Sequence, residues 1–277
     1  MIATATQKKM TREMEELKGK LKATWMTGHY DVFARFMEAD AVEFYRRLGF
    51  APGVRLLDVG CGAGQLALIA SRAGADATGC DIATNWLEKA QARAEAEGLT
   101  ARFEEGDAEA LPYEDGSFDA VTSLVGAMFA PRPNLVAKEL ARVCRPGGTI
   151  AMINWTAEGF IGQMFRVIAK HIAPSGMPSP VLWGDEATVR ERFGDDVSAL
   201  HLKRGMYHFE YPFSPEGVVD FFRENYGPMT RAFASLENGA QAQLHAELSG
   251  LWACHNRARG ERTKVEAEYL EVIATRA

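Results

Sequence analysis

The chain alternates between short apolar runs and longer segments with apolar side chains at helical spacing, most regularly between residues 55 and 155. Short apolar runs bounded by glycine, proline or aspartate predict buried strands, and apolar positions three or four residues apart predict helices that bury one face. The predicted strands cover residues 55–59, 75–80, 101–104, 118–124 and 149–154. Because strands and helices alternate through short links, the pattern predicts right-handed β–α–β units and a parallel sheet with helices on both faces.

The first 50 residues follow a helical pattern instead. A second helical pattern in residues 32–48 follows the first, and Gly49, Pro52 and Gly53 end it. The polar face of the first helix mixes both signs of charge, which favours a packed lid over a helix that binds a partner or a membrane surface. The apolar stripe of this first helix consists of Met10, Met14, Leu17, Leu21 and Trp25.

The pattern is less regular after residue 155, and individual helix starts become more informative there. Ser214 followed by Pro215 predicts a helix with serine as its N-cap and proline at its first position. Earlier in the chain, Asn85 and Glu88 have the spacing of a capping box and predict another helix start. The remaining predictions are helices at 160–172, 185–193 and 238–255, a loop at 174–180, and strands at 197–202, 206–211 and 268–275.

Composition and charge narrow the class of protein. The 277 residues, 47% of them apolar, fit one large α/β domain with an added lobe or two small domains. A net charge of −6 without a basic stripe argues against a nucleic-acid binder. The four cysteines form no CxxC pair, so neither disulfides nor a metal site are predicted and a reducing cytoplasm fits best. No secretory leader or membrane span is recognisable, so we expect a soluble, unexported protein.

The candidate chemistry lies at three strand ends. Gly60, Gly62 and Gly64 follow the first predicted strand, Asp81 ends the second, and Asp107 follows the third. In an open α/β sheet these carboxyl ends form one ligand-binding edge, and the helix after the glycines offers free N–H groups to a negative group. A carboxylate such as Asp81 suits a ribose diol, because it can accept two short hydroxyl hydrogen bonds.

Other residues near these strand ends have secondary roles. Asp107 could accept from an adenine amine while the Ala108 N–H donates to a ring nitrogen, and Asp58 is expected to brace the glycine loop through backbone amides. Cys61 has no histidine partner in the sequence pattern, so its small size explains it better than a nucleophilic role. A dinucleotide fold prefers GxGxxG, but the third glycine here is Gly64 and Gln65 follows it, which favours a ligand without a pyrophosphate.

Five ordered segments of the chain resemble the class I S-adenosylmethionine-dependent methyltransferases, particularly the group that includes the ubiquinone and menaquinone biosynthesis C-methyltransferases. The segments are LDVGCGAG (57–64), GCDI (79–82), GDAEALPY (106–113), SFDAV (117–121) and LARVCRPGG (140–148). The resemblance covers about residues 40 to 155. It implies a Rossmann-like α/β fold with a seven-stranded sheet whose last strand is antiparallel, completed by the strands predicted after residue 196.

The resemblance also implies a domain organisation and a set of donor-binding residues. The single domain would comprise a helical extension or lid (1–50), a cofactor-binding core (51–155), and the rest of the sheet with inserted helical substrate-binding elements (156–277). S-adenosylmethionine would bind with its methionine part at the glycine loop, its ribose at Asp81 and its adenine at Asp107. The complete expected set is Tyr30, Asp58, Gly60, Cys61, Gly62, Gly64, Gln65, Asp81, Ile82, Trp86, Asp107, Ala108 and Leu124. Tyr30 would fold over the cofactor, and Leu124 would lie beside the reacting methyl.

The sequence says less about the methyl acceptor and the reaction chemistry than about the donor site. Candidate bases are His29, Tyr30, His171, His208 and Tyr211, but none has the spacing of a catalytic pair, so no catalytic residue is assigned. The aromatic residues of the last 120 positions favour an enclosed pocket for a small, largely apolar or aromatic metabolite; they are Phe160, Phe165, Phe213, Phe221, Phe222 and Tyr226. The alternative is an NAD(P)-dependent oxidoreductase or a noncatalytic nucleoside-ligand-binding protein on the same fold. The acceptor atom (oxygen, nitrogen, sulfur or carbon) and the oligomeric state stay open.

Overall fold

A single seven-stranded sheet with the strand order β3-β2-β1-β4-β5-β7-β6 forms the centre of the protein. The computed structural model describes residues 11–173 and 176–277, so Met10 and residues 174 and 175 of the predicted loop lie outside the described part. β7 is antiparallel to both of its neighbours, β5 and β6, and the other pairs are parallel, which confirms the expected sheet. The strands are β1 (Arg55–Val59), β2 (Asp76–Asp81), β3 (Arg102–Glu105), β4 (Phe118–Leu124), β5 (Cys144–Trp155), β6 (Val197–Tyr211) and β7 (Thr263–Arg276).

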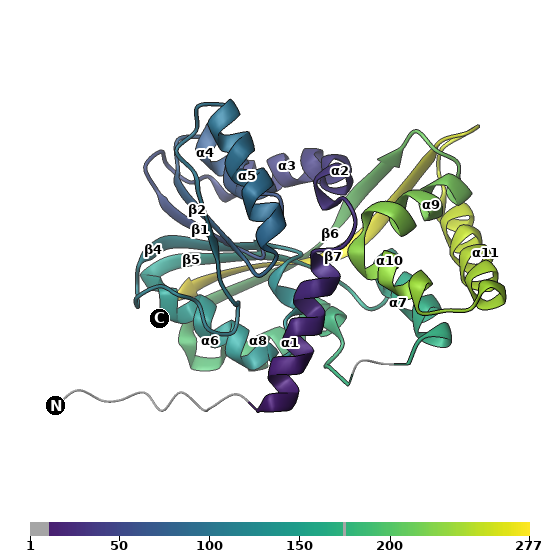
Figure 1. The fold of residues 1–277 in the computed structure, drawn as a ribbon. Helices are drawn as coiled ribbons and strands as arrows, with labels where there is room; N and C mark the ends of the chain where they lie inside the picture. The colour runs from purple at the N-terminus through teal and green to yellow at the C-terminus, as the bar shows by residue number, and fades with distance from the viewer. Residues whose placement is uncertain (1–10, 174–175) are drawn as a thin grey trace.

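Helices cover both faces of the sheet (Figure 1). α3, α4 and α5 lie on one face, and α6 and α8 lie on the other. Apolar side chains of the central strands, such as Leu56, Val121 and Ile150, are fully buried between these layers. The helices of this part are α3 (Glu38–Leu48), α4 (Gln65–Arg72), α5 (Thr84–Ala96), α6 (Pro133–Val143) and α8 (Glu186–Phe193). No helix among residues 11–173 and 176–277 is long and apolar enough to cross a membrane.

A helical lobe packs around the far ends of β6 and β7 (Figure 1). Its core is aromatic: Phe209 and Tyr211 of β6 contact Phe222 and Trp252, and all four side chains are buried. The helix predicted from Ser214 and Pro215 is present, and the Ser214 side chain accepts from the Gly217 backbone N–H. The helices of the lobe are α7 (Phe160–His171), α9 (Pro215–Asn225), α10 (Gly227–Ala234) and α11 (Asn238–His255).

Two sequence-based boundaries are wrong. The strands predicted at 197–202 and 206–211 are one strand, because β6 pairs with β7 from Val197 to Tyr211. Gly205, in the polar gap between the two predictions, lies against the Tyr269 ring, which leaves no room for a Cβ at this position. The capping box at Asn85 is also absent. α5 begins at Thr84 without a side-chain cap, and the Asn85 amide instead donates to the Met26 carbonyl across the molecule at 3.2 Å.

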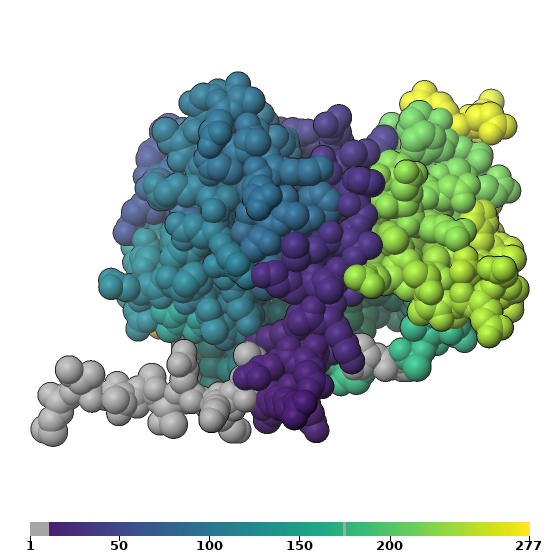
Figure 2. All heavy atoms as spheres, viewed as in Figure 1, coloured from purple at the N-terminus to yellow at the C-terminus, as the bar shows by residue number. Residues whose placement is uncertain are grey.

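The first helix, α1 (Arg12–Trp25), lies between the core and the lobe. Figure 2 shows it, in purple, filling the groove between the blue core and the green lobe. None of its residues is fully buried, although it contacts α10. After α1, the chain continues through a short helix α2 (Tyr30–Phe33) and a 3-10 turn η1 (Ala34–Met37) into α3. The N-terminal segment therefore contacts both the core and the lobe, while its first helix stays at the surface.

Candidate active site

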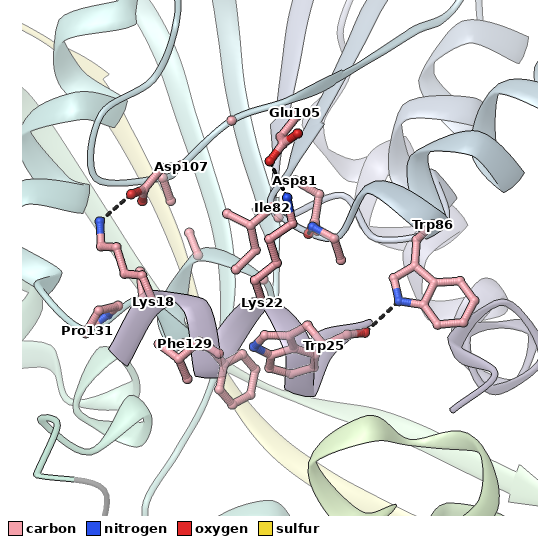
Figure 3. A pocket seen from close by; sticks show the side chains of 18 of the residues that line it. Lys18, Lys22, Trp25, Asp81, Ile82, Trp86, Glu105, Asp107, Phe129 and Pro131 are labelled. Carbon is pink, nitrogen blue, oxygen red and sulfur yellow. Dashed lines mark hydrogen bonds and ion pairs between the residues drawn. The ribbon is translucent and has the colours of Figure 1, made fainter. Parts of the chain in front are cut away.

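A cavity of about 360 Å³ lies at the carboxyl ends of β1, β2, β3 and β4, with α1 across its mouth (Figure 3). Such a volume is in the range of small-molecule sites. Seven of the residues expected from the sequence line this cavity: Tyr30, Gly60, Asp81, Ile82, Trp86, Asp107 and Ala108. The fold thus brings side chains from four separate segments to one space.

The glycine loop supports the floor of this cavity by close backbone packing, and Gly60 is its one glycine in the cavity wall. Gly60 has φ +71°, and a Cβ built there would lie 2.8 Å from the Gly126 Cα, so the loops after β1 and β4 touch directly. Gly62 has φ +51°, and a Cβ there would lie 2.8 Å from Cε1 of the Tyr30 ring. Both positions need glycine for conformation and for space. Gly64 precedes the first residue of α4, whose free N–H groups therefore begin at this loop.

Asp81 is fixed by the glycine loop. Its Oδ2 accepts the Gly62 backbone N–H and its Oδ1 accepts the Ala83 backbone N–H, each at 2.8 Å. Burial raises the pKa of this carboxyl, and the two backbone N–H groups act in the opposite direction. An ionised carboxylate has about four acceptor positions, so Asp81 keeps acceptor capacity for hydroxyl groups of a ligand in the cavity.

Asp58 lies beneath the loop and does not line the cavity. Its carboxylate accepts from Thr122 Oγ1 at 3.3 Å and from the Ala67 backbone N–H in the first turn of α4. The side chain is 2% exposed, and burial raises its pKa to about 7. This places Asp58 as a support for the start of α4, in line with the bracing role expected from the sequence.

Five other expected residues also lie outside the cavity wall: Cys61, Gly62, Gly64, Gln65 and Leu124. The Gln65 side chain donates to the Ala34 carbonyl at 2.8 Å and so ties the N-terminal segment to the core. Burial raises the pKa of the Cys61 thiol well above its usual value, which makes it a poor nucleophile. In place of Leu124, the next residues Val125 and Gly126 line the cavity, and Val125 is a non-glycine residue at φ +48°.

The roof of the cavity is formed by Lys18, Lys22 and Trp25 of α1; sequence reasoning placed Trp25 on the apolar stripe of this helix and missed the two lysines. Lys18 forms an ion pair with Asp107 and Lys22 forms one with Glu105 (Figure 3). Lys18 also pairs with the fully buried carboxylate of Glu109. These pairings join residues more than 80 positions apart, and no local pattern reveals them.

The C-terminal end of α1 is attached separately. Trp86 Nε1 donates to the Trp25 carbonyl at 2.7 Å, and the Asn85 amide holds Met26 next to it. Glu109 has a second cationic partner, because the Arg132 guanidinium lies 2.7 Å from its Oε2. The roof is thus anchored to the loop after β3 by lysines and to α5 by hydrogen bonds.

A second, smaller cavity of about 30 Å³, here called the aromatic chamber, adjoins the first one. Trp25, Tyr30, Val125 and Phe129 line both spaces, and the Trp25 and Phe129 ring centroids are 5.0 Å apart. None of the residues that line the chamber is charged or a histidine. Its other walls are Phe33, Met37, Trp155, Ile161, Met164, Phe209, Phe222 and Tyr226.

Most of the candidate bases are remote from both cavities. His171 pairs with Glu247 at 3.2 Å, His208 pairs with Asp40 at 3.0 Å, and neither lines a cavity wall. Tyr211 is sealed in the aromatic core of the lobe. Of the aromatic residues expected to enclose an acceptor, Phe222 and Tyr226 line the chamber; the rest, Phe160, Phe165, Phe213 and Phe221, do not.

Comparisons with known proteins agree with this geometry. A family model described as "Methyltransferase domain" matches residues 57–152. An uncharacterised protein of Mycobacterium bovis, Mb1440c, is 40% identical over 240 residues, which are 86% of this chain and 87% of that protein. The demethylmenaquinone methyltransferase of Thermus thermophilus is 38% identical over 155 residues, which are 52% of this chain and 70% of that enzyme.

The fold is also similar to solved structures. The YcgJ protein of Bacillus subtilis matches with a TM-score of 0.59 at 19% sequence identity, and the match covers 86% of this chain and 98% of that one. At this identity the match concerns the architecture of the sheet and its helices, and the roles of side chains must be argued from the cavities.

Proposed function

Because the chain belongs to the class I S-adenosylmethionine-dependent methyltransferases, we propose that it transfers the methyl group of S-adenosylmethionine to a small, largely apolar or aromatic acceptor. The donor supplies a methyl group on a positively charged sulfur, and in-line displacement joins the methyl carbon to the acceptor atom while the bonding electron pair returns to sulfur. The chain has to position both molecules and exclude water, which accounts for much of the acceleration in such reactions.

The donor assignment follows from the residues of the larger cavity. The backbone of the loop at Gly60 would contact the methionine part, Asp81 would accept the ribose hydroxyls, and Ile82 and Trp86 would flank the adenine. Asp107 and the Ala108 N–H would meet the adenine edge, where Lys18 shares the Asp107 carboxylate. A volume of about 360 Å³ and an acceptor-rich floor fit a nucleoside with an amino-acid tail.

The acceptor assignment rests on one observation: the aromatic chamber has no charged lining residue and shares a wall with the donor cavity. An acceptor in the chamber would therefore lie next to the reacting methyl at Val125 and Phe129. Such a wall suits a small apolar molecule better than a nucleic acid, whose phosphates need cationic partners. We further propose that the protein acts in the cytoplasm, where its four free cysteines, including the exposed Cys254, would stay reduced.

Thermal unfolding with candidate ligands tests this proposal. We expect S-adenosylhomocysteine to raise the melting temperature and NAD to leave it unchanged, because binding to the folded state alone stabilises it. A shift with NAD and none with S-adenosylhomocysteine would reverse the assignment in favour of an oxidoreductase.

Asp81→Asn tests the ribose contact. Hydrogen bonds to a charged group contribute about 1.5–3 kcal/mol, so we expect S-adenosylhomocysteine to bind roughly 10- to 150-fold more weakly, at tenfold for each 1.4 kcal/mol. Asp76→Asn is the matched control: it removes a carboxylate from the opposite end of β2, where Asp76 pairs with Arg102. If calorimetry gives equal affinities for the two variants, Asp81 does not contact the donor.

A further inference from the structure

Two phenols line the aromatic chamber, those of Tyr30 and Tyr226, and of these only Tyr226 does not also line the donor cavity. The residue lies between α9 and α10, where its backbone groups are used by Phe222, Met229 and Thr230. Its phenol oxygen makes no hydrogen bond with any residue of the described part of the chain. The aromatic rings of Phe33, Trp25 and Phe222 surround it, with centroids 4.9, 5.8 and 6.0 Å from its own.

An unpaired phenol in such surroundings is costly. A donor that faces an apolar cavity without a partner is unfavourable, and a ligand that supplies an acceptor atom removes this cost. Burial raises the pKa of the Tyr226 phenol far above its usual value, so the group stays protonated and offers a hydrogen. It can donate to a ligand, and it cannot serve as a base near neutral pH.

The remaining chamber walls restrict the charge of the occupant. A cation in the chamber would find no carboxylate, and an anion would find no lysine, arginine or histidine among the lining residues. Removal of an unpaired charge from water is strongly unfavourable. Aromatic walls instead favour flat rings, which pack against them edge-to-face or offset.

We propose that the aromatic chamber binds an uncharged aromatic acceptor that bears an oxygen, and that Tyr226 determines this specificity by donating its phenol hydrogen bond to that oxygen. The inference rests on the proposed methyl transfer and adds the chemical class of the acceptor. Since no lining residue is a carboxylate or histidine, the acceptor enters uncharged, and a proton that it must lose passes to solvent after methyl transfer, when the positive charge of the donor has moved to the methylated acceptor.

The small volume of the chamber means that one of its wall residues must move when a ligand enters. A volume of about 30 Å³ admits one or two water molecules, so an aromatic ring enters only if a wall residue moves. Trp155, Phe209 and Phe222 are buried in the core and lobe, whereas Trp25 is carried by α1, which has no fully buried residue. Displacement of Trp25 with α1 would therefore enlarge the chamber and open it toward the donor cavity.

Calorimetric titration of the protein saturated with S-adenosylhomocysteine tests this inference. The probes share one ring system: 2-naphthol, naphthalene, 2-naphthoate and 2-naphthylmethylamine, which is protonated at neutral pH. We expect 2-naphthol to bind at least fivefold more tightly than each of the others. Tyr226→Phe should abolish the preference for 2-naphthol over naphthalene, because phenylalanine keeps the ring and removes the donor.

Tyr211→Phe is the matched control. Tyr211 also has a buried phenol without a partner, but it lies outside both cavities, so this variant should bind 2-naphthol like the wild type. The inference is overturned if naphthalene binds as well as 2-naphthol, if a charged probe binds most tightly, if no probe binds, or if Tyr211→Phe weakens binding as much as Tyr226→Phe.

The melting shift with S-adenosylhomocysteine, measured on the same samples, separates two kinds of failure. If the shift is present and the 2-naphthol result fails, the acceptor class is wrong and the methyltransferase proposal stands. If the shift itself is absent from the wild type, the donor assignment fails, and the acceptor inference fails with it.

Discussion

The floor and the roof of the donor cavity are built in different ways. The floor is backbone: the loop at Gly60 lies against Gly126, and the Asp81 carboxylate holds two backbone N–H groups. The roof is α1, which has no fully buried residue and is attached through Lys18 and Lys22. Close-packed backbone has little freedom to move, whereas lysine side chains are long and flexible.

This difference assigns the two parts different tasks. A rigid floor presents the same acceptor groups to the donor in every turnover, as positioning requires. A roof held by side chains can open without disturbing the sheet, and it carries Trp25, which also lines the aromatic chamber. In the proposed reaction one helix would therefore control access to both substrates, while the floor would select the donor.

The floor is tested most severely by Gly60→Ala. The new methyl group would meet the Gly126 Cα at 2.8 Å, and alanine would have to adopt φ +71°. The left-handed conformation costs about 1–2 kcal/mol, and overpacking typically costs a further 1–3 kcal/mol. We expect the free energy of unfolding, measured in urea, to fall by about 3 kcal/mol and binding of S-adenosylhomocysteine to be lost.

Gly49→Ala separates the two contributions. Gly49 ends α3 with φ +63°, but a Cβ there meets nothing within 4 Å. This variant should lose only about 1–2 kcal/mol of stability and should bind S-adenosylhomocysteine normally. If both variants lose the same stability, the loops after β1 and β4 are not tightly packed against each other, and the floor can adjust to an added methyl group.

A second test of the floor uses pH. The buried Asp58 has a pKa of about 7 in the folded protein, above its usual 3.8. Because the folded state holds this proton more tightly, the stabilisation is complete below the unfolded pKa and is lost as pH rises through the folded one. Between pH 5 and 8 this single group lowers the free energy of unfolding by about 2–3 kcal/mol.

Asp58→Asn removes the titration and keeps the shape of the side chain. We expect the difference in unfolding free energy between pH 5 and 8 to be smaller in this variant than in the wild type by about 2–3 kcal/mol. Asp119→Asn serves as a control that should leave this difference unchanged, because the Arg55 guanidinium beside Asp119 holds the pKa of that carboxyl well below its usual range and its contribution to stability is lost only below about pH 5. If the difference in unfolding free energy between pH 5 and 8 is the same in Asp58→Asn as in the wild type, a group other than Asp58 titrates in this range.

The floor could be predicted from the sequence because its determinants are local. Glycine spacing after an apolar run, with aspartates at the next strand ends, predicts a loop and a carboxylate at one sheet edge, and the fold places Gly60, Asp81 and Asp107 in one cavity. The seven-stranded sheet was implied by the family resemblance, whereas the strand pattern alone divided β6 into two segments. Its cofactor contacts stay predictions until a ligand is bound.

The roof could not be predicted, because its contacts join distant segments. Asn85 has the spacing of a capping box with Glu88, yet its side-chain amide donates to the Met26 carbonyl and does not cap the helix start. Lys18 is an ordinary surface residue in the sequence, and only the fold places it against Glu109. The sequence pattern did favour a lid for α1, but which side chains hold it depends on tertiary packing.

The smallest expected effects are those of single lysine substitutions in the roof. Lys18→Gln removes the partner of Asp107 and of the fully buried Glu109, whereas Lys22→Gln removes a pair with Glu105 whose side chains are 35% and 56% exposed. Exposed pairs contribute about 0.2–1 kcal/mol and partly buried ones more. We expect S-adenosylhomocysteine to dissociate roughly five- to tenfold faster from Lys18→Gln and at most about twofold faster from Lys22→Gln, followed by stopped-flow tryptophan fluorescence.

Lys20→Gln is the control for the loss of charge, because Lys20 lies on the same helix, is exposed and pairs with no residue of the described part of the chain. It should dissociate like the wild type. If all three variants behave alike, the net charge of α1 matters and the individual pairs do not, and the helix is then a less specific cover than the contacts of Lys18 indicate. If only Lys18→Gln accelerates release, the buried Glu109 is the anchor that keeps the roof closed over the donor.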